Sequence, residues 1–191
     1  MGTASLQNGR VEMFETERFI EACREAMKDP DTRAIKEVVQ RAVSEPGQIV
    51  KTLGEPKRAG IGTLHQSDDL TVLNIIWGPG MTLHPHNHRM LAIIGLYGGQ
   101  ENNTFYKRSE SGLSEQGGKE LHSKETVVLG DAVIHAVTNP LDELTGAIHV
   151  YSGDFFATPR SEWDPETLEE HPYDVEHTLR VFEESNKGLE D

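Results

Sequence analysis

Short runs rich in Val, Ile, Thr and aromatic residues follow one another from about Gly60 to Tyr151, separated by clusters of Gly, Asp, Asn and Ser. Many short strands at this spacing are typical of a β-sandwich or barrel. The runs expected to form strands are 60–66, 70–77, 90–97, 103–108, 125–129, 132–138 and 147–151. The polar, Gly- and Ser-rich segment 109–118 is expected to be a surface loop. The sequence therefore predicts a mainly β fold.

Two helices are expected before these strands. Apolar residues recur at helical spacing after Thr16, which is a plausible N-cap, and again over 34–43. Asp29-Pro30-Asp31 ends the first helix and Pro46-Gly47 the second. At 191 residues the chain suits one domain. We expect its parts to be a helical segment packed on the outside of the barrel, the barrel itself and an acidic C-terminal extension, at 1–50, 51–160 and 161–191, with a loose terminus at 1–12.

The charge and the cysteine content narrow the expected partners and location. A net charge of −14 argues against nucleic acid or an anionic membrane surface as a partner. Cys23 is the single cysteine, so no internal disulfide forms, and a cytoplasmic, reducing location is the simplest interpretation. We see neither a secretory leader nor an apolar run long enough to span a membrane. The acidic tail is expected to be a solvated surface.

Three histidines stand at alternate positions, His84, His86 and His88, and His135 follows at a distance. In an extended strand, residues i and i+2 point to the same face, so such imidazoles can converge on one metal ion. Same-face neighbours lie roughly 6.5 Å apart at Cα, which separates His84 from His88 by about 13 Å. One ion will not easily bind all three, and a distant strand carrying His135 would close the site.

Two motif spacings surround these histidines. Gly80 lies six residues before His86, giving G-x5-H-x-H, and His135 lies four before Asn139, giving H-x3-N. Both resemble the motifs of the cupin superfamily, small barrels made of two antiparallel sheets. The resemblance implies a cupin (double-stranded β-helix) barrel with the N-terminal helical pair outside it. It selects His86, His88 and His135 as metal ligands.

The glutamate that often completes the cupin metal site is missing. Ala92 and Ile93 occupy its two possible positions, although Gly99 fits the closing glycine of the motif. Three neutral imidazoles leave a divalent ion its full charge, which suits a substrate that brings an anionic donor such as a thiolate. By ligand type alone, zinc, copper and nickel stay open. His84 lies at the rim, either as a substrate-contacting group or as a partly exposed bystander.

Segments around the histidines resemble one cupin family, the thiol dioxygenases, and within it the cysteine dioxygenase type I group with its bacterial 3-mercaptopropionate dioxygenases. The matching segments, within about 55–160, are 77–80, 86–99, 134–139 and 149–156. The resemblance implies an iron-dependent enzyme with Fe(II) bound by His86, His88 and His135. Its reaction would convert a small thiol, a 3-mercapto acid or a cysteine-like compound, to the sulfinic acid with O2.

The resemblance also implies residues that act on the substrate. Tyr151 would lie beside the bound substrate and oxygen, with His149 as its hydrogen-bonding partner on the same strand face. The family's serine before that histidine is Ala147 here, so the relay is incomplete. Arg160, nine residues after Tyr151, falls where the mercaptopropionate group carries an arginine. It would be either a bidentate clamp on a substrate carboxylate or a solvated arginine. The absence of an arginine at Gly60 makes free cysteine the poorer substrate.

Other functions stay open at the sequence level. A cupin dioxygenase that cleaves a C–C bond, for example in a β-diketone, would share the three histidines but need a larger, more apolar pocket. A non-catalytic cupin could bind a metal or a small molecule, and a zinc-dependent isomerase or lyase is a further alternative. The expected partners are a small thiol and O2, and the oligomeric state is left open.

Overall fold

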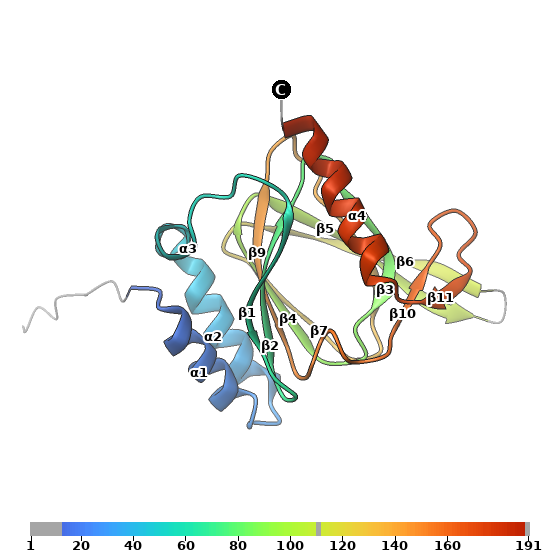
Figure 1. Cartoon of the computed structure of the whole chain (residues 1–191). Coiled ribbons are helices and arrows are strands. Elements are labelled where there is room, and N and C mark those ends of the chain that lie inside the picture. Colours follow the sequence, from blue (N-terminus) through green and yellow to red (C-terminus); the bar gives the residue numbers. More distant parts are fainter. Residues whose placement is uncertain (1–12, 110–111, 190–191) are drawn as a thin grey trace, which may run out of the picture.

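Two antiparallel sheets face each other in the computed structural model, which describes residues 13–109 and 112–189 (Figure 1). The five-stranded sheet runs in the order β1 (Gly60–Gln66), β2 (Thr71–Trp77), β9 (Thr145–Tyr151), β4 (Ala92–Gly98) and β7 (Thr126–Leu129). The six-stranded sheet runs β11 (Glu170–Pro172), β10 (Ser161–Trp163), β3 (Thr82–Asn87), β8 (Ile134–Thr138), β5 (Gln100–Ser109) and β6 (Gly112–His122). The terminus expected over residues 1–12 lies outside the described residues.

This architecture confirms the mainly β, cupin-type barrel with N-terminal helices. Strand β2 shows how the sequence specifies it. Leu73, Ile75 and Trp77 belong to the core between the sheets, whereas Val72 and Ile76 belong to the core beneath the helices. Since alternate side chains point to opposite faces, a strand covered on both sides reads as a continuous apolar run.

Three helices cover the outer face of the five-stranded sheet (Figure 1): α1 (Thr16–Ala26), α2 (Thr32–Ser44) and α3 (Pro46–Leu53). The expected pair is present, but α3 is an addition. Helix α2 ends just before Pro46, and Pro46 is the first residue of α3. Proline suits this position because the N–H that it lacks would have no partner in the first helical turn. The N-cap of α1 is Glu15 and not Thr16, and it makes no side-chain capping hydrogen bond.

Helix α2 reaches the sheet at a glycine. A Cβ on Gly95 would lie 2.6 Å from Val39 Cγ1, so a larger residue would push the helix off β4. Two further glycines have left-handed backbone at the turns around the histidine motif, with φ of +63° at Gly80 and +74° at Gly99. A side chain is disfavoured there. Helix α2 is therefore held on this face by its close approach to Gly95 as well as by apolar burial.

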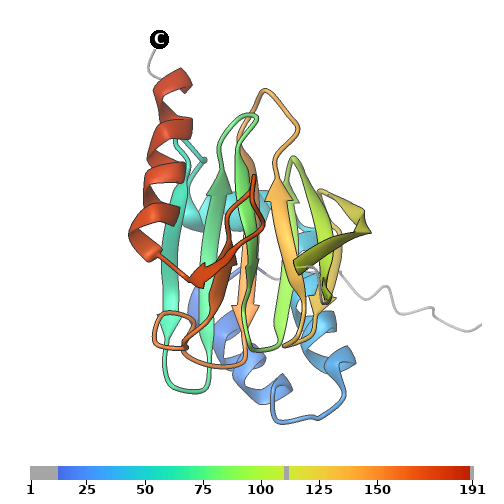
Figure 2. The same ribbon diagram turned by 90° about the vertical axis from the view of Figure 1, so that its right-hand side faces the viewer.

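Helix α4 (Val175–Asn186), followed by the short helix η1 (Lys187–Leu189), closes the side of the barrel away from α1 to α3. It runs alongside β1 and also contacts β3 (Figure 2). Phe182 stacks on Trp77 with ring centroids 5.3 Å apart. The Asn186 side chain bonds both the N–H and the C=O of Ala59. The acidic extension is therefore more than solvated surface, because it covers an open edge of the core.

Strand β6 corrects the loop expected over 109–118. It lies at the edge of the six-stranded sheet and pairs with β5. Nearly all of its side chains are exposed, so its sequence carries no apolar alternation. Its backbone pairing with β5 makes it a strand, and of its side chains only those of Leu113 and Leu121 are buried, so hydrophobicity gives little sign of it. Within the described residues, no helix is both long and apolar enough to cross a membrane.

Candidate metal centre

His86, His88 and His135 come together inside the barrel, and we call these three side chains the trio. His86 lies on β3 opposite His135 on β8, and His88 follows directly after β3. Their ring centroids are 4.7 to 5.1 Å apart. One nitrogen of each ring lies within 4.8 Å of the others, and all three rings are buried. The trio is therefore a candidate site for one metal ion.

Hydrogen bonds to the outer nitrogens orient two of these rings. The Nδ1 of His86 donates to the carbonyl of His84 at 3.0 Å, and the Nδ1 of His135 donates to the Asn103 amide oxygen at 2.6 Å. Since a carbonyl only accepts, each Nδ1 carries the proton and each Nε2 keeps its lone pair. The Nε2 atoms of His88 and His135 lie 3.3 Å apart. Partners on the far nitrogen commonly fix metal-binding histidines in this way.

The trio is uncharged at neutral pH. Burial holds the pKa of His86 and His88 well below the usual range, with the neighbouring histidines adding to the effect. Burial likewise lowers the pKa of His135 to about 3. Among the described residues, no carboxylate belongs to this group, and Ala92, at one of the two positions where the motif often carries glutamate, packs into the core. An ion here would keep its full positive charge.

Tyr151 and His149 stand beside the trio on β9. His149 Nδ1 lies 3.0 Å from the Tyr151 hydroxyl, and the Tyr151 ring centroid is 5.1 Å from that of His88. Both side chains are buried. Burial raises the pKa of Tyr151 and lowers that of His149 to about 3, so both are neutral. The pair places one hydroxyl at the edge of the trio.

Arg160 is buried and not solvated, with only 7% of its surface exposed. Its guanidinium carbon lies 3.8 Å from the ring centroid of Phe155 and 3.6 Å from that of Tyr173. Nη1 has no hydrogen-bond partner among the described residues. Phe155 and Tyr173 in turn lie 6.1 and 6.0 Å from His88 and His86. A fixed positive charge with an unused donor thus lies one aromatic ring away from the trio.

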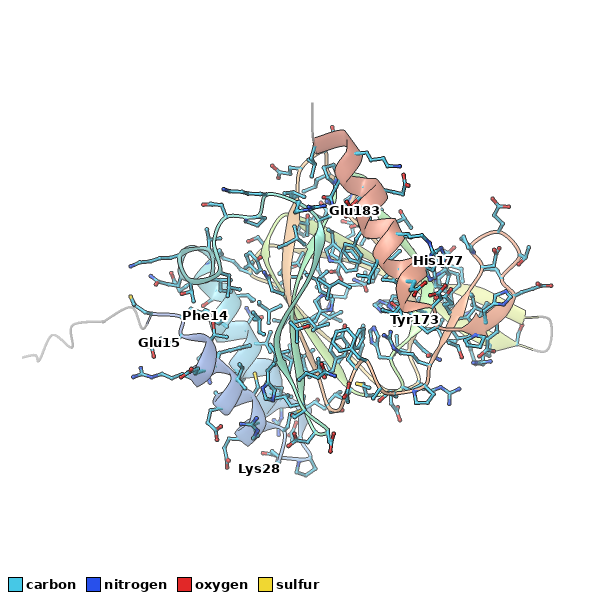
Figure 3. All side chains as sticks on the ribbon, viewed as in Figure 1. Phe14, Glu15, Lys28, Tyr173, His177 and Glu183 are labelled. Atoms are coloured by element: carbon cyan, nitrogen blue, oxygen red, sulfur yellow. The ribbon has the colours of Figure 1, made fainter. Side chains whose placement is uncertain are left out.

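His84 turns away from the trio into a second group, His84, Glu162 and His177, which we call the clasp. His84 Nε2 and His177 Nδ1 each lie 3.1 Å from a different oxygen of Glu162. The two rings stack at 4.6 Å, and the N–H of Asp174 donates to Glu162 at 2.9 Å. Tyr173 and His177 lie at the end of α4 that meets the six-stranded sheet (Figure 3). The clasp therefore fastens α4 to the barrel.

A pocket opens onto the trio, and neither His84 nor Arg160 lines it. Its walls are aromatic, aliphatic and histidine side chains from both sheets and from the C-terminal segment. They are Ile61, Ile75, Trp77, Leu83, His86, His88, His135, Val137, His149, Tyr151, Phe155, Tyr173, Thr178 and Phe182. The sequence analysis did not predict Tyr173 and Phe182 as site residues. Their aromatic side chains in an otherwise acidic segment are the signal that could have indicated burial.

No protein-family model matches the chain. Among solved structures, the chain is similar to an RmlC-like cupin family protein with a double-stranded β-helix fold from Methanocaldococcus jannaschii, at 12% identity and a TM-score of 0.46, over 54% of this chain and 87% of that one. A Bacillus halodurans protein aligns at 12% and 0.48, over 55% and 77%. An oxalate oxidase in complex with glycolate aligns at 16% and 0.40, over 52% and 53%. These likenesses are too weak to bear on function.

Proposed function

We propose that this chain is a non-haem Fe(II) thiol dioxygenase. The observation that carries the proposal is the trio, three buried neutral imidazoles whose group includes no carboxylate among the described residues. The net reaction is R–SH + O2 → R–SO2H. Both oxygen atoms are added to sulfur, which is oxidised while O2 is reduced, so no further co-reactant is required.

The donor set of the trio fits this metal. Imidazole is a common ligand of iron, as it is of zinc and copper, and His86, His88 and His135 would hold the ion. When bound, Fe(II) would supply the redox chemistry by which O2 reacts with a thiolate. Because all three protein ligands are neutral, an anionic thiolate adds no charge repulsion at the site. This is the reason to favour a thiol over a neutral substrate.

The surrounding residues would bind and shield the substrate. Trp77, Phe155 and Phe182 line the pocket with apolar surface, which excludes water from the reacting sulfur. The Tyr151 ring lies beside His88, and its hydroxyl lies 3.0 Å from His149 Nδ1. The unused Nη1 of Arg160 suits a substrate carboxylate, since guanidinium groups bind carboxylates in a bidentate manner. We therefore propose a short thiol that carries a carboxylate, such as a 3-mercapto acid.

Oxygen uptake tests the proposal. Metal-free protein is loaded with Fe(II) without oxygen and then given 3-mercaptopropionate, cysteine or cysteamine in air-saturated buffer. We expect one O2 consumed per thiol, and a product that has gained two oxygen atoms by mass spectrometry. Failure with every thiol would reject the proposal. Uptake with a β-diketone instead would support the C–C cleaving alternative.

The proposed role of Arg160 has its own test. In Arg160→Gln, KM for 3-mercaptopropionate should rise by about 10- to 100-fold, which corresponds to the loss of a charged hydrogen bond. KM for cysteamine, which has no carboxylate, should change little. Arg108→Gln is the control, because Arg108 already pairs with Glu170, whereas Arg160 Nη1 is unpaired and its guanidinium stacks on the pocket residues Phe155 and Tyr173. Equal losses with both thiols would exclude a carboxylate clamp.

A further inference from the structure

A buried carboxylate lies behind the trio and the Tyr151 pair. Glu101 on β5 is fully buried, and within the described residues no Lys or Arg pairs with it. Its Oε1 accepts from the Asn103 side-chain amide at 2.9 Å, and its Oε2 accepts from Trp77 Nε1 at 2.9 Å. Two donors therefore fix the carboxylate in place and leave it with lone pairs to share.

The imidazole of His149, next to Glu101, has a ring nitrogen without a hydrogen-bond partner among the described residues. His149 Nε2 is buried without a hydrogen-bond partner in the described part of the chain, and it lies 3.9 Å from Glu101 Oε2. That separation exceeds a hydrogen bond, so the proposed pairing requires the His149 ring to move slightly toward the fixed carboxylate. The other ring nitrogen already faces the Tyr151 hydroxyl at 3.0 Å. Since buried polar atoms are nearly always paired, Glu101 is the partner that this nitrogen is placed to meet.

We propose that Glu101 is the positioning residue of this site, because it accepts the Nε2 proton of His149 and so fixes the direction of the Tyr151 hydroxyl. A neutral imidazole has a single N–H. With that proton on Nε2, the Nδ1 of His149 accepts from Tyr151. The phenol proton then points at His149, and an oxygen lone pair of Tyr151 is left for a donor group in the space beside the trio.

The same carboxylate also reaches a proposed metal ligand. Asn103 donates to Glu101 through its amide nitrogen and accepts from His135 Nδ1 through its amide oxygen. The chain from Glu101 through Asn103 polarises the N–H of His135 and makes its Nε2 a better donor to a cation. Glu101 thereby affects both the Tyr151 hydroxyl, through His149, and the proposed ligand His135, through Asn103. Its catalytic importance rests on the proposed function, but the tautomer that it selects does not.

Histidine nitrogen NMR on the metal-free protein tests the tautomer directly. His149 is assigned by comparison with His149→Gln, and spectra are taken at about pH 8 because burial raises the pKa of Glu101 to about 7. The wild type should carry the His149 proton on Nε2. In Glu101→Gln the side-chain amide can donate to Nε2, so the proton should move to Nδ1. A wild-type proton on Nδ1 would overturn the proposal, and this measurement needs no variant of Glu101.

Activity then separates this proposal from the proposed function. With Fe(II) loaded, Glu101→Gln should lower kcat for the best thiol by about 10- to 100-fold, and Glu101→Asp should recover part of it. Glu120→Gln, at an exposed position, is the control and should match the wild type. A shifted tautomer with unchanged kcat would overturn the role in positioning Tyr151. An Nε2 proton in a protein that oxidises no thiol would reject the dioxygenase and keep the assignment of Glu101.

Discussion

Strand β3 contributes to two groups of metal-ligand side chains, the trio and the clasp, and they differ in how their nitrogens are paired. In the clasp, His84 and His177 each meet their own oxygen of Glu162 at 3.1 Å. In the trio, the Nε2 atoms of His88 and His135 face each other at 3.3 Å, and no carboxylate in the described chain joins them. His135 Nε2 keeps its lone pair, and a cation between the two rings would let His88 Nε2 bind in the same way.

The difference shows that ligand type alone does not define a metal site. Both groups contain three residues able to bind an ion. The clasp is complete through its own hydrogen bonds, and the N–H of Asp174 adds a further donor to Glu162. In the trio, the outer nitrogens of His86 and His135 donate to fixed acceptors, so their inner nitrogens keep a lone pair, and His88 Nδ1 has no partner among the described residues. We therefore assign the clasp to holding α4 and the trio to metal.

The largest expected effect is on metal affinity. His135→Ala removes one of three ligands and should weaken binding of Fe(II) or Zn(II) by more than about 100-fold, beyond the loss typical of an outer partner. His177→Ala should leave the affinity within about threefold. Competition with a chromophoric chelator under anaerobic conditions measures both. Similar losses in the two variants would break the distinction between trio and clasp.

Acid should destabilise the metal-free protein through the trio. The folded-state pKa of His86, His88 and His135 is lowered, so below the unfolded value of about 6.5 the unfolded chain binds protons that the folded one does not. Stability is then lost as pH falls from 7 to 5, by up to about 1.4 kcal/mol per pH unit for each such histidine. His149 acts in the same sense, since its pKa is lowered to about 3.

Glu101 opposes this trend in the same pH range. Its folded-state pKa of about 7 lies above the unfolded value, so the folded form binds a proton first and gains stability as pH falls. The net slope should still be a loss toward acid. Denaturant unfolding at several pH values measures it, and His135→Leu should reduce the slope by about one proton. The exposed His122 provides the control, and equal slopes in His122→Asn and His135→Leu would contradict the account.

Breaking the clasp should reduce stability without affecting the metal. Glu162→Ala leaves His84 buried without its acceptor and frees the N–H of Asp174, which should lower the free energy of unfolding by about 2 kcal/mol. Metal affinity should stay within about threefold of the wild type. Glu176→Ala, at an exposed position of α4, should be nearly silent. A drop in metal affinity equal to that of His135→Ala would place the clasp in the metal site.

The smallest effect concerns the start of α4. Asp174 is its N-cap and accepts from the N–H groups of Glu176 and His177. Asp174→Ala should cost about 1 kcal/mol. Asp31→Ala removes the N-cap of α2 and is the matched control. Hydrogen exchange should show faster opening of α4 only in the first variant. Equal exchange of α4 in both would mean that the clasp alone holds the helix.

The barrel and the trio could be predicted because the signals for them lie within short segments of the sequence. His86 and His88 share one short stretch, and His135 lies at the H-x3-N spacing from Asn139 on the strand that pairs with β3. Glu101 and Asn103 carry no such signal, because they reach His149 and His135 across strands that are distant in sequence.

The buried side chains of the C-terminal segment were harder to predict from the sequence, for a different reason. The average composition of this segment is acidic and indicates solvent exposure, and such an average does not reveal the few side chains that are buried. Arg160, Tyr173 and Phe182 are placed by how β10 and α4 fold back over the pocket, which depends on tertiary contacts. Strand β6 was hidden likewise, since its pairing with β5 uses backbone groups and not apolar side chains.

An anaerobic titration of the metal-free protein with Co(II), followed by 3-mercaptopropionate, tests the central claim most directly. The account predicts one bound ion per chain and a new thiolate-to-metal charge-transfer band when the thiol is added. His177→Ala should keep both signals and His135→Ala should lose both. Two bound ions per chain, or a spectrum that no small thiol changes, would contradict the account.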